Sequence, residues 1–303
     1  MLTRVLETAL PVFAALFLGI LCREKKMLSR EGIDALKKVA VDIALPAELL
    51  IAFAGTEYTL SGIRIPLIMF CVCLAALGLG FALKKAIRIP GRLMPFLMTG
   101  FEAGMMGYSL FALLHPGESA DFAILDLGQV LFVFTVYKMM LSGKGKGGQV
   151  IRQAFSSPVL WAILIGVALG ASGAFEALRP CGITGVLEST ANFIAAPAGC
   201  LILLTVGYDL ELKGIRWPRV LLYTGLRVLV MGVMGVALYS LDKALLGGIL
   251  KPGALILMFS LPAPFVLPVF TDAEDEKADI ASTLSVMTLF CLAVFAVLAA
   301  TGL

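Results

Sequence analysis

The chain has 303 residues, of which 60% are hydrophobic and 15% are charged, and its formal net charge is +3. Its mean hydropathy is +0.98, whereas soluble globular domains contain only about 45–50% apolar residues. This composition excludes an ordinary soluble domain and indicates an integral membrane protein.

Apolar stretches long enough to cross a bilayer as helices recur along the whole chain. A hydrocarbon core about 30 Å thick needs about 20 apolar residues per helical span. The strands of a membrane β-barrel would alternate in polarity and be about half as long, so a barrel does not fit. The sequence predicts an all-α membrane protein with ten transmembrane helices, at 5–22, 33–53, 63–83, 94–114, 121–141, 157–174, 186–208, 219–240, 253–270 and 279–301.

The distribution of lysine and arginine predicts the orientation of these spans. The loops after the odd-numbered spans carry 18 of these residues, whereas the opposite loops carry five. Because cytoplasmic loops are the more basic ones, both termini are expected on the outer side of the cell membrane. The same rule accounts for the basic clusters without a nucleic-acid partner. The cluster at 23–26 follows the first apolar run without a cleavage site, so that run is expected to be a retained span.

Two pairs of segments indicate an internal duplication. PVFAALFLG at 11–19 matches PVLWAILIG at 158–166, and ALPAELLI at 44–51 matches AAPAGCLI at 195–202. The offsets, 147 and 151 residues, are close to half of the chain. Each unit would hold five spans, and an odd number forces the second unit to enter the membrane from the opposite side. The sequence therefore predicts two inverted repeats, 1–145 and 146–303, as in many secondary transporters.

The fourth span of each predicted repeat contains residues that break helices. Span 4 carries GFEAGMMGYS at 100–109, and span 9 carries SLPAPFVLP at 260–268. Glycine and proline both disfavour a continuous helix, and unwound backbone at membrane depth must line a cavity or be buried in protein. Interrupted helices at matching positions predict a midplane binding site where the two breaks cross. The plainer alternative is a pair of kinked helices with glycine at close contacts.

At four places the sequence resembles the auxin efflux carrier family, which includes plant auxin exporters and bacterial carriers assigned to malonate or malate. These places are FAALFLGILCREKKMLSREGIDALKKV, LPAELLIAF, MGYSLF and SLPAPFVLPVFTDAEDEKADIASTLSVMTLF. The resemblance implies ten helices in two inverted repeats with crossed helices 4 and 9. It also implies a scaffold domain of spans 1, 2, 6 and 7 beside a transport domain of spans 3–5 and 8–10. Bile acid/sodium symporters and sodium/proton antiporters share this fold.

Three positions depart from the pattern of that family. Its members commonly carry asparagine where this chain has Glu102, and proline where it has Ser109. In the auxin carriers that asparagine belongs to the site of the substrate carboxylate. An asparagine also often stands four residues before the span 2 proline, where this chain has Asp42. A glutamate at position 102 is therefore expected to change the chemistry of the site.

Ionisable groups inside spans are costly and are functional candidates by default. Glu102, in a poorly hydrated site, is expected to carry a coupling proton or to coordinate a cation. Asp42 lies one turn before Pro46 on the same helix face. Arg227 is expected to hold a substrate carboxylate or to neutralise a buried acid. The other candidates for substrate binding or coupling are Gly104, Gly107, Ser109, Gln129, Asn192, Ser260, Pro262 and Pro264.

Two further acids keep two interpretations each. Asp126 shares a helix face with Gln129 and is either functional or a boundary residue near the outer surface. Glu48 lies on a different face of span 2 from Asp42 and is either a vestibule residue or a packing residue.

Enzyme chemistry finds no support in the sequence. The chain has one histidine, His115, in the predicted external loop, and it has no HExxH motif or metal-ligand cluster. We therefore expect no catalytic residue, no metal and no cofactor. The acidic stretch TDAEDEKAD at 271–279 is expected to form a solvated turn and to place negative charge at the start of helix 10, which favours the helix dipole, with partner binding as the less favoured alternative.

These patterns predict a secondary active transporter of a small organic solute, most simply a carboxylate. Alternating access by an elevator or rocking motion, with H⁺ coupling through Glu102, is the preferred mechanism. The alternatives are Na⁺ coupling or uniport, a sodium or other cation/proton antiporter on the same fold, and a membrane ligand sensor. The lipid bilayer is the predicted surrounding. Substrate identity, direction and oligomeric state, a homodimer included, are left open.

Overall fold

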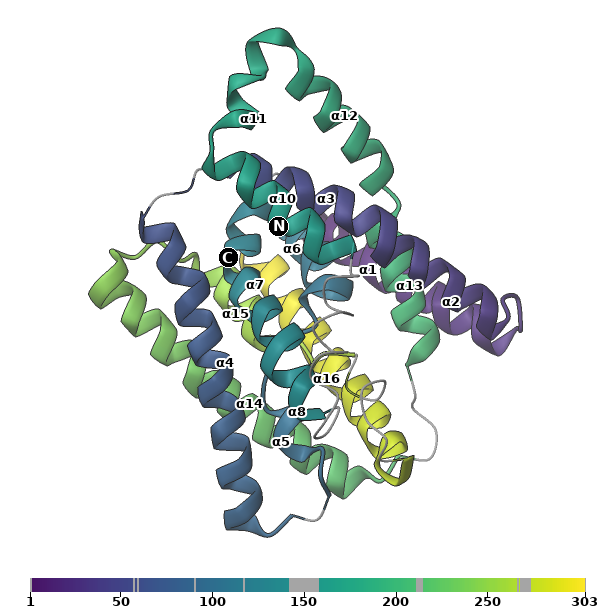
Figure 1. The fold of residues 1–303 in the computed structure, drawn as a ribbon. Helices are drawn as coiled ribbons and strands as arrows, with labels where there is room; N and C mark the ends of the chain where they lie inside the picture. The colour runs from purple at the N-terminus through teal and green to yellow at the C-terminus, as the bar shows by residue number, and fades with distance from the viewer. Residues whose placement is uncertain are drawn as a thin grey trace.

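A computed structural model describes residues 2–56, 58, 60–89, 91–116, 118–141, 158–210, 215–265, 267 and 274–302 (Figure 1). Within these ranges the chain is helical and contains no strand. The predicted boundary between the repeats at residue 145 lies outside the described residues, as do Pro268 and the first part of the acidic stretch, 271–273. The prediction of an all-helical protein holds for the part that is described.

The first half of the chain forms helices that follow the predicted spans, with several interruptions. They are α1 (Leu2–Glu24), α2 (Arg30–Val39), the π-helix η1 (Ala40–Ala44), α3 (Leu45–Ala54), α4 (Leu60–Ile87), α5 (Met94–Leu97), the π-helix η2 (Ala103–Gly107), α6 (Tyr108–Leu114), α7 (Ser119–Phe132), the π-helix η3 (Val133–Tyr137) and α8 (Lys138–Leu141).

The second half repeats this pattern of long and broken helices. Its elements are α10 (Pro158–Ala171), α11 (Ala174–Ala177), the 3₁₀-helix η4 (Arg179–Cys181), α12 (Ile183–Ala195), α13 (Ala198–Asp209), α14 (Trp217–Leu241), the π-helix η5 (Asp242–Leu246), α15 (Pro252–Ser260) and α16 (Glu274–Thr301).

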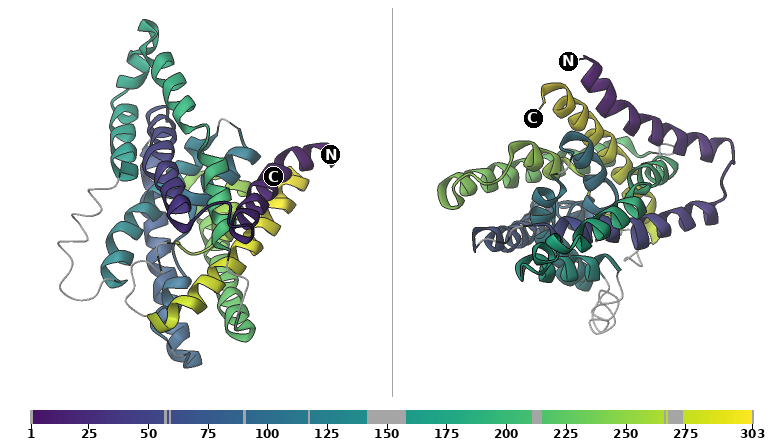
Figure 2. Two further views of the ribbon diagram at one scale, coloured as in Figure 1. Left: turned by 90° about the vertical axis from the view of Figure 1, so that its right-hand side faces the viewer. Right: turned by 90° about the horizontal axis from the view of Figure 1, so that it is seen from above.

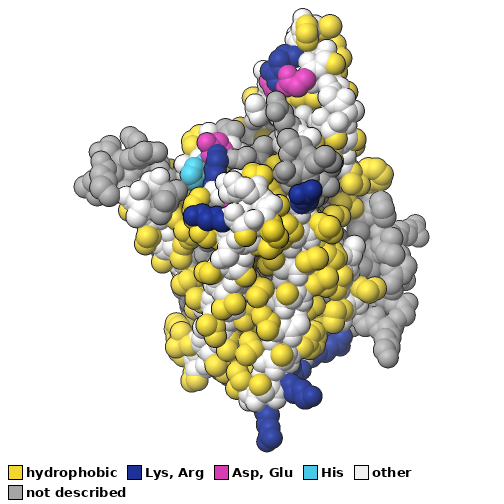
Figure 3. All heavy atoms as spheres, turned by 90° about the vertical axis from the view of Figure 1, so that its left-hand side faces the viewer, with side chains coloured by type: hydrophobic (Ala, Val, Ile, Leu, Met, Phe, Trp, Pro, Cys, Tyr) yellow, Lys and Arg dark blue, Asp and Glu magenta, His cyan; other side chains and the backbone are white. Residues whose placement is uncertain are grey.

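Five described stretches are long and apolar enough to cross a membrane. They are Arg64–Ile87, Phe122–Leu141, Ile183–Asp209, Trp217–Leu246 and Asp279–Thr301. A sixth would be the pair Pro158–Ala171 and Ala174–Cys181, which bends by 67°. Figure 3 shows one face of the molecule, where hydrophobic side chains cover the middle, and charged side chains lie toward the two ends: Lys and Arg at the lower end, and Lys and Arg together with Asp and Glu near the upper end. This arrangement fits a helical membrane protein, and the full set of ten spans stays a prediction.

The helices pack in two groups. The first helix group comprises α1, α2, α3, α10, α12 and α13, in which α1 packs on α13 and α3 packs on α10 and α12. The second helix group comprises α4, α7, α14, α15 and α16, in which α4 packs on α7 and α14 packs on α15 and α16. The segment from η2 to α6 contacts α13 of the first group as well as α7, α15 and α16 of the second. This segment therefore lies at the boundary between the groups.

Two glycines permit the closest helix contacts of the first helix group. A Cβ atom added to Gly19 of α1 would overlap the carbonyl oxygen of Leu204 in α13. A Cβ atom added to Gly166 of α10 would lie 2.8 Å from the carbonyl oxygen of Leu50 in α3. Only glycine lets the backbones approach so closely. In both contacts, a helix from one half of the chain thus packs on a helix from the other half.

Two acidic residues near the start of α16 bind the start of α14 and the segment before α5. Asp279 is 6% exposed and pairs with Arg216 (2.7 Å) and Arg219 (2.5 Å). The Glu276 carboxylate accepts hydrogen bonds from the backbone N–H groups of Arg92 (2.6 Å) and Leu93 (3.0 Å), just before α5. The acidic stretch was expected to be a solvated turn with negative charge for the start of the last helix. α16 begins within the stretch, at Glu274, but these two acids are not simply solvated, because they bind groups at the start of α14 and before α5. Burial of the Asp279 carboxylate is tolerated because it is paired with two arginines.

The ends of the chain, marked N and C, lie near each other in Figure 2, where α1 runs beside α16. This proximity is compatible with both termini lying on one side of a membrane, as the distribution of basic residues predicts.

Candidate functional site

The fourth predicted span, 94–114, is interrupted where the sequence places its glycines. The short helix α5 ends at Leu97, residues 98–102 are not helical, and η2 begins at Ala103. Gly100 has a φ of +67°, in the left-handed region that glycine adopts most readily. The Gly107 N–H then bonds to the Glu102 carbonyl at 3.1 Å, five residues back, which begins the π-helical turn. Glu102 therefore lies at the junction between loop and helix.

The ninth predicted span, 253–270, is also interrupted, and the two breaks contact each other. The helix α15 ends at Ser260, and the segment from Leu261 to Pro264 is not helical. The Glu102 N–H donates to the Pro262 carbonyl at 2.9 Å, and the Glu102 carboxylate accepts from the Phe265 N–H. A Cβ atom added to Gly100 would lie 2.8 Å from Cγ of Pro264. We call this contact between the two breaks the crossing.

Gly107 belongs to the same contact. A Cβ atom added there would lie 2.9 Å from Cδ1 of Leu261 and 2.8 Å from the Phe122 ring. A larger residue at position 107 would therefore push the two breaks apart.

Arg227 of α14 joins both breaks from one side. Its Nη1 donates to the carbonyls of Leu97 (2.6 Å) and Thr99 (3.5 Å), and its Nη2 donates to those of Gly100 (2.7 Å) and Leu261 (2.8 Å). Its Nε also donates to the Leu261 carbonyl, at 3.2 Å. A guanidinium has five N–H donors, and every one of them is engaged. Arg227 therefore binds carbonyls left over at the C-terminal ends of two half-helices.

This arrangement differs from the sequence expectation for Arg227. Within the described ranges the guanidinium has no carboxylate at ion-pair distance, and its Cζ lies 5.8 Å from the centroid of the Phe101 ring, a cation–π contact. The side chain is 3% exposed. Because its donors are saturated by backbone, Arg227 has no free N–H to offer a substrate carboxylate. The backbone carbonyls that take these donors carry no signature in the sequence.

A second polar network links α7 to both sides of the break in the fourth predicted span. The Asp126 carboxylate accepts from the Tyr108 hydroxyl (3.1 Å) and from Nε2 of Gln129 (2.9 Å). The amide oxygen of Gln129 accepts from the Phe101 N–H at 3.5 Å. Asp126 is 2% exposed, so of its two interpretations the structure favours an interior polar group over a boundary residue. Sequence reasoning had not singled out Tyr108, although it stands in the MGYSLF motif.

The boundary between the helix groups carries the remaining candidates. Gly104 lies against Leu45 of α3, and Ser109 lies against Gly199 of α13. Asp42 lies in η1 just before Pro46 and is half-buried, as are Pro46 and Glu48. Neither Asp42 nor Glu48 has a hydrogen bond or ion pair within the part of the chain that the structure describes. Both acids are thus partly accessible and have no partner among the described residues that fixes their charge.

Proline explains why Asp42 sits in a π-helical turn. Pro46 has no N–H to give to the carbonyl four residues earlier, which is that of Asp42. The chain widens instead, and the Leu45 N–H bonds to the Ala40 carbonyl.

Two candidates do not join the crossing as binding groups. Asn192 is exposed on α12, which projects from the bundle in Figure 1, so it does not contribute to this site. The Ser260 hydroxyl donates to the Leu257 carbonyl (2.8 Å) in its own helix and lies 3.6 Å from the Cys291 sulfur. Ser260 therefore stabilises the end of α15 rather than presenting a hydroxyl to a ligand.

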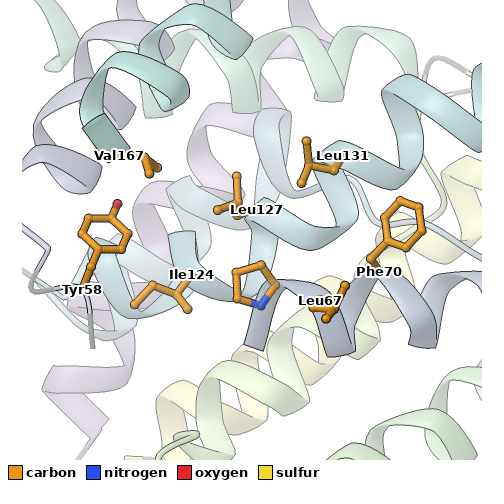
Figure 4. A pocket seen from close by; sticks show the side chains of 8 residues that line it. Tyr58, Leu67, Phe70, Ile124, Leu127, Leu131 and Val167 are labelled. Atoms are coloured by element: carbon orange, nitrogen blue, oxygen red, sulfur yellow. The ribbon is translucent and has the colours of Figure 1, made fainter. Parts of the chain in front are cut away.

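A hollow of about 470 Å³ opens elsewhere, between α4, α7 and α10 (Figure 4). Its lining is apolar, and the one hydroxyl there, that of Tyr58, donates to the Phe53 carbonyl at 3.0 Å. A site for a carboxylate needs polar groups that fix its orientation. The hollow is therefore not a candidate for the solute site. Among the described residues no cluster of His, Cys, Asp and Glu could hold a metal ion.

Comparison with known proteins supports a transporter. The chain is similar to an uncharacterized transporter of Methanothermobacter thermautotrophicus, with 25% identity over 290 residues that cover 91% of each chain. No family model matches the sequence. The name of this relative and the apolar helices together indicate a membrane transporter.

Proposed function

We propose that the protein is a secondary active carrier that moves a small organic solute across the cell membrane by alternating access. The observation that carries this proposal is the crossing, where two interrupted helices contact each other through Glu102, Gly100 and Arg227. Breaks of this kind at matching positions of two halves are typical of carriers. The relative named as a transporter supports the same class.

The packing of the first helix group supports two inverted repeats. The segments that match in sequence are 11–19 with 158–166 and 44–51 with 195–202. The first predicted span of each half packs on the second predicted span of the other half: α1 packs on α13, which belongs to span 7, and α10 packs on α3, which belongs to span 2. In the second helix group, α4 packs on α7 as α14 packs on α16. Equivalent contacts in both halves are what a two-fold axis within the membrane would produce. We propose the second helix group, with the crossing, as the transport domain and the first as the scaffold.

The acids around the crossing favour coupling to protons. Glu102, Asp42 and Glu48 would repel a carboxylate solute while they are ionised, and Arg227 has no donor left to attract it. Binding of such a solute is therefore easier once these acids have taken up protons. Protonation of Glu102 would also weaken its acceptor bond to the Phe265 N–H, which joins the two breaks. Proton uptake and movement at the crossing are linked through that bond.

A cation/proton antiporter is the second candidate. The half-buried acids Asp42 and Glu48, which have no protein partner in the described part of the chain, favour it because they could face a cation. The two candidates differ in the species whose transport is coupled to the proton, which is an organic solute in the first and a cation in the second.

Counterflow in proteoliposomes separates these candidates. We expect labelled dicarboxylates to accumulate against unlabelled solute, faster at pH 6 than at pH 8. Glu102→Gln should reduce the pH dependence, while the control Glu176→Gln, an exposed residue paired with Arg179, should keep it in full. Cation-driven proton flux without any organic solute would support the antiporter. Saturable ligand binding without flux would instead indicate a sensor.

A further inference from the structure

The crossing contains a positive charge that is part of the protein itself, the guanidinium group of Arg227. All five N–H donors of Arg227 are directed to the carbonyls of Leu97, Thr99, Gly100 and Leu261. These four oxygens come from both broken helices and converge on one buried charge. The side chain reaches them from α14, a third helix.

Converging carbonyls of this kind are ligands for a free cation in other carriers. Where helices are broken at the midplane, unwound carbonyls and the C-terminal ends of half-helices coordinate Na⁺. The negative ends of the two half-helix dipoles attract positive charge for the same reason. In this protein the guanidinium satisfies both the oxygens and the dipoles.

We propose that Arg227 occupies the position of a coupling cation permanently, so that the crossing binds no Na⁺ during the transport cycle. This inference deepens the proposed function, because it leaves the proton as the ion that moves. The absence of Na⁺ binding at the crossing can nevertheless be measured without any transport.

Two properties of arginine make the substitution permanent. A guanidinium does not lose its proton in proteins, so the charge cannot be released on one side of the membrane. A second monovalent cation at about 4 Å would bind roughly a thousandfold more weakly at an effective dielectric constant near 20. Arg227 therefore supplies the charge and also excludes a competitor.

The wild-type protein provides the first test. The purified full-length chain in detergent is heated in NaCl, KCl or N-methyl-D-glucamine chloride at equal ionic strength. We expect the same Tm in all three salts. A saturable rise of Tm with Na⁺ alone would overturn the proposal, whatever the transport assays show.

Chemical rescue provides the second test. Arg227→Ala should lower the Tm, and guanidinium chloride at about 1–10 mM should restore at least half of the loss, since it refills a buried, carbonyl-lined cavity. Urea at the same concentration has the same shape without the charge and should restore much less. Equal rescue by urea and guanidinium would contradict a role for the charge.

Arg23→Ala is the matched control. Arg23 also donates to helix-end carbonyls, those of Tyr208 (2.9 Å) and Leu210 (2.5 Å), but its side chain is 31% exposed. Because water reaches that site, guanidinium should not raise the Tm of this variant. If Arg227→Ala does not fold, the salt comparison on the wild-type protein still decides the proposal. Loss of transport with an unchanged salt response would count against the proposed function and not against this inference.

Discussion

The crossing and the contact between α1 and α13 both join helices that are distant in sequence, yet different forces hold them. At the crossing, Arg227 and Glu102 make directional hydrogen bonds to exposed backbone groups. Between α1 and α13, Gly19 and Gly207 let the two backbones touch along the helices, and the polar side chain of Arg23 bonds only at the end of α13. Polar bonds can be exchanged for other polar bonds when a proton or solute arrives, whereas backbone contact through glycine has no such alternative. The comparison indicates which contact can rearrange and which is fixed.

The largest effect is expected from removing the charge at the crossing. Arg227→Met keeps an unbranched apolar side chain in place of the arginine stem but leaves four buried carbonyls without their donors. Breaking a buried charged cluster costs about 3–5 kcal/mol, so the free energy of unfolding should fall by that amount. Thermal unfolding measures it, with Arg23→Met as the control that should lose less than about 1 kcal/mol. Equal losses in both variants would mean that the crossing is not a special contact.

A smaller but clear loss is expected at the fixed contact. Gly19→Ala would place a Cβ atom against the Leu204 carbonyl and force α1 away from α13. Overpacking of this kind costs about 1–3 kcal/mol. Gly78→Ala is the control, since a Cβ atom there meets nothing within 4 Å. The control should be neutral or slightly stabilising, and a destabilised control would show that α4 tolerates less than its open surface suggests.

The network beside the crossing should contribute less than the crossing itself. Tyr108→Phe removes one hydrogen bond to Asp126 and keeps the ring in place. A net loss of about 0.5–1.5 kcal/mol is typical of one hydrogen bond. Asp126 retains its bond from Gln129, so the protein should still fold. A loss as large as that of Arg227→Met would mean that the Asp126 network stabilises the fold as much as the crossing does, which would contradict this prediction.

The smallest effect is expected at an exposed pair that joins Glu118, between α6 and α7, to Lys251, just before α15. Lys251 bonds to the Glu118 carboxylate at 2.7 Å, and this hydrogen bond lowers the pKa of Glu118 below its usual 4.5. A lowered pKa stabilises the fold above pH 4.5, and this stabilisation is lost as the pH falls through the lowered value. Glu118→Gln should therefore melt slightly below wild type at pH 7, with the difference shrinking toward pH 3. A difference that grows as the pH falls would contradict this assignment.

The sequence predicts the parts of this molecule that depend on side-chain type. Continuous apolar runs predict α4, α14 and α16, and the glycines near Glu102 and the prolines at 262 and 264 predict the interruptions. The partners at the crossing are a different matter. Arg227 and Glu102 bind backbone groups of Leu261 and Phe265, and a backbone carbonyl or N–H looks the same at every residue. No sequence pattern could therefore assign those bonds.

Asn192 shows a second limit. Its residue type suggested a ligand contact, but its exposure depends on how α12 leaves the bundle before Pro197. The angle between the helices on either side of a proline break follows from tertiary packing, which the local sequence does not determine.

The central claim is that the boundary between the two helix groups changes during transport, and a disulfide can test it directly. Cβ of Ser109 lies 3.7 Å from a Cβ atom placed on Gly199, within the range of disulfides. The variant carries Ser109→Cys and Gly199→Cys, with the exposed native cysteines Cys71, Cys181 and Cys200 changed to serine. The control pair, Gly235→Cys with Phe259→Cys, joins α14 to α15 within the second helix group, where the Cβ separation is 3.5 Å.

We measure counterflow before and after oxidation, and again after reduction. Oxidation should stop counterflow through the Ser109–Gly199 pair, reduction should restore it, and the control pair should transport in both states. Full counterflow with the Ser109–Gly199 disulfide intact would contradict movement at this boundary.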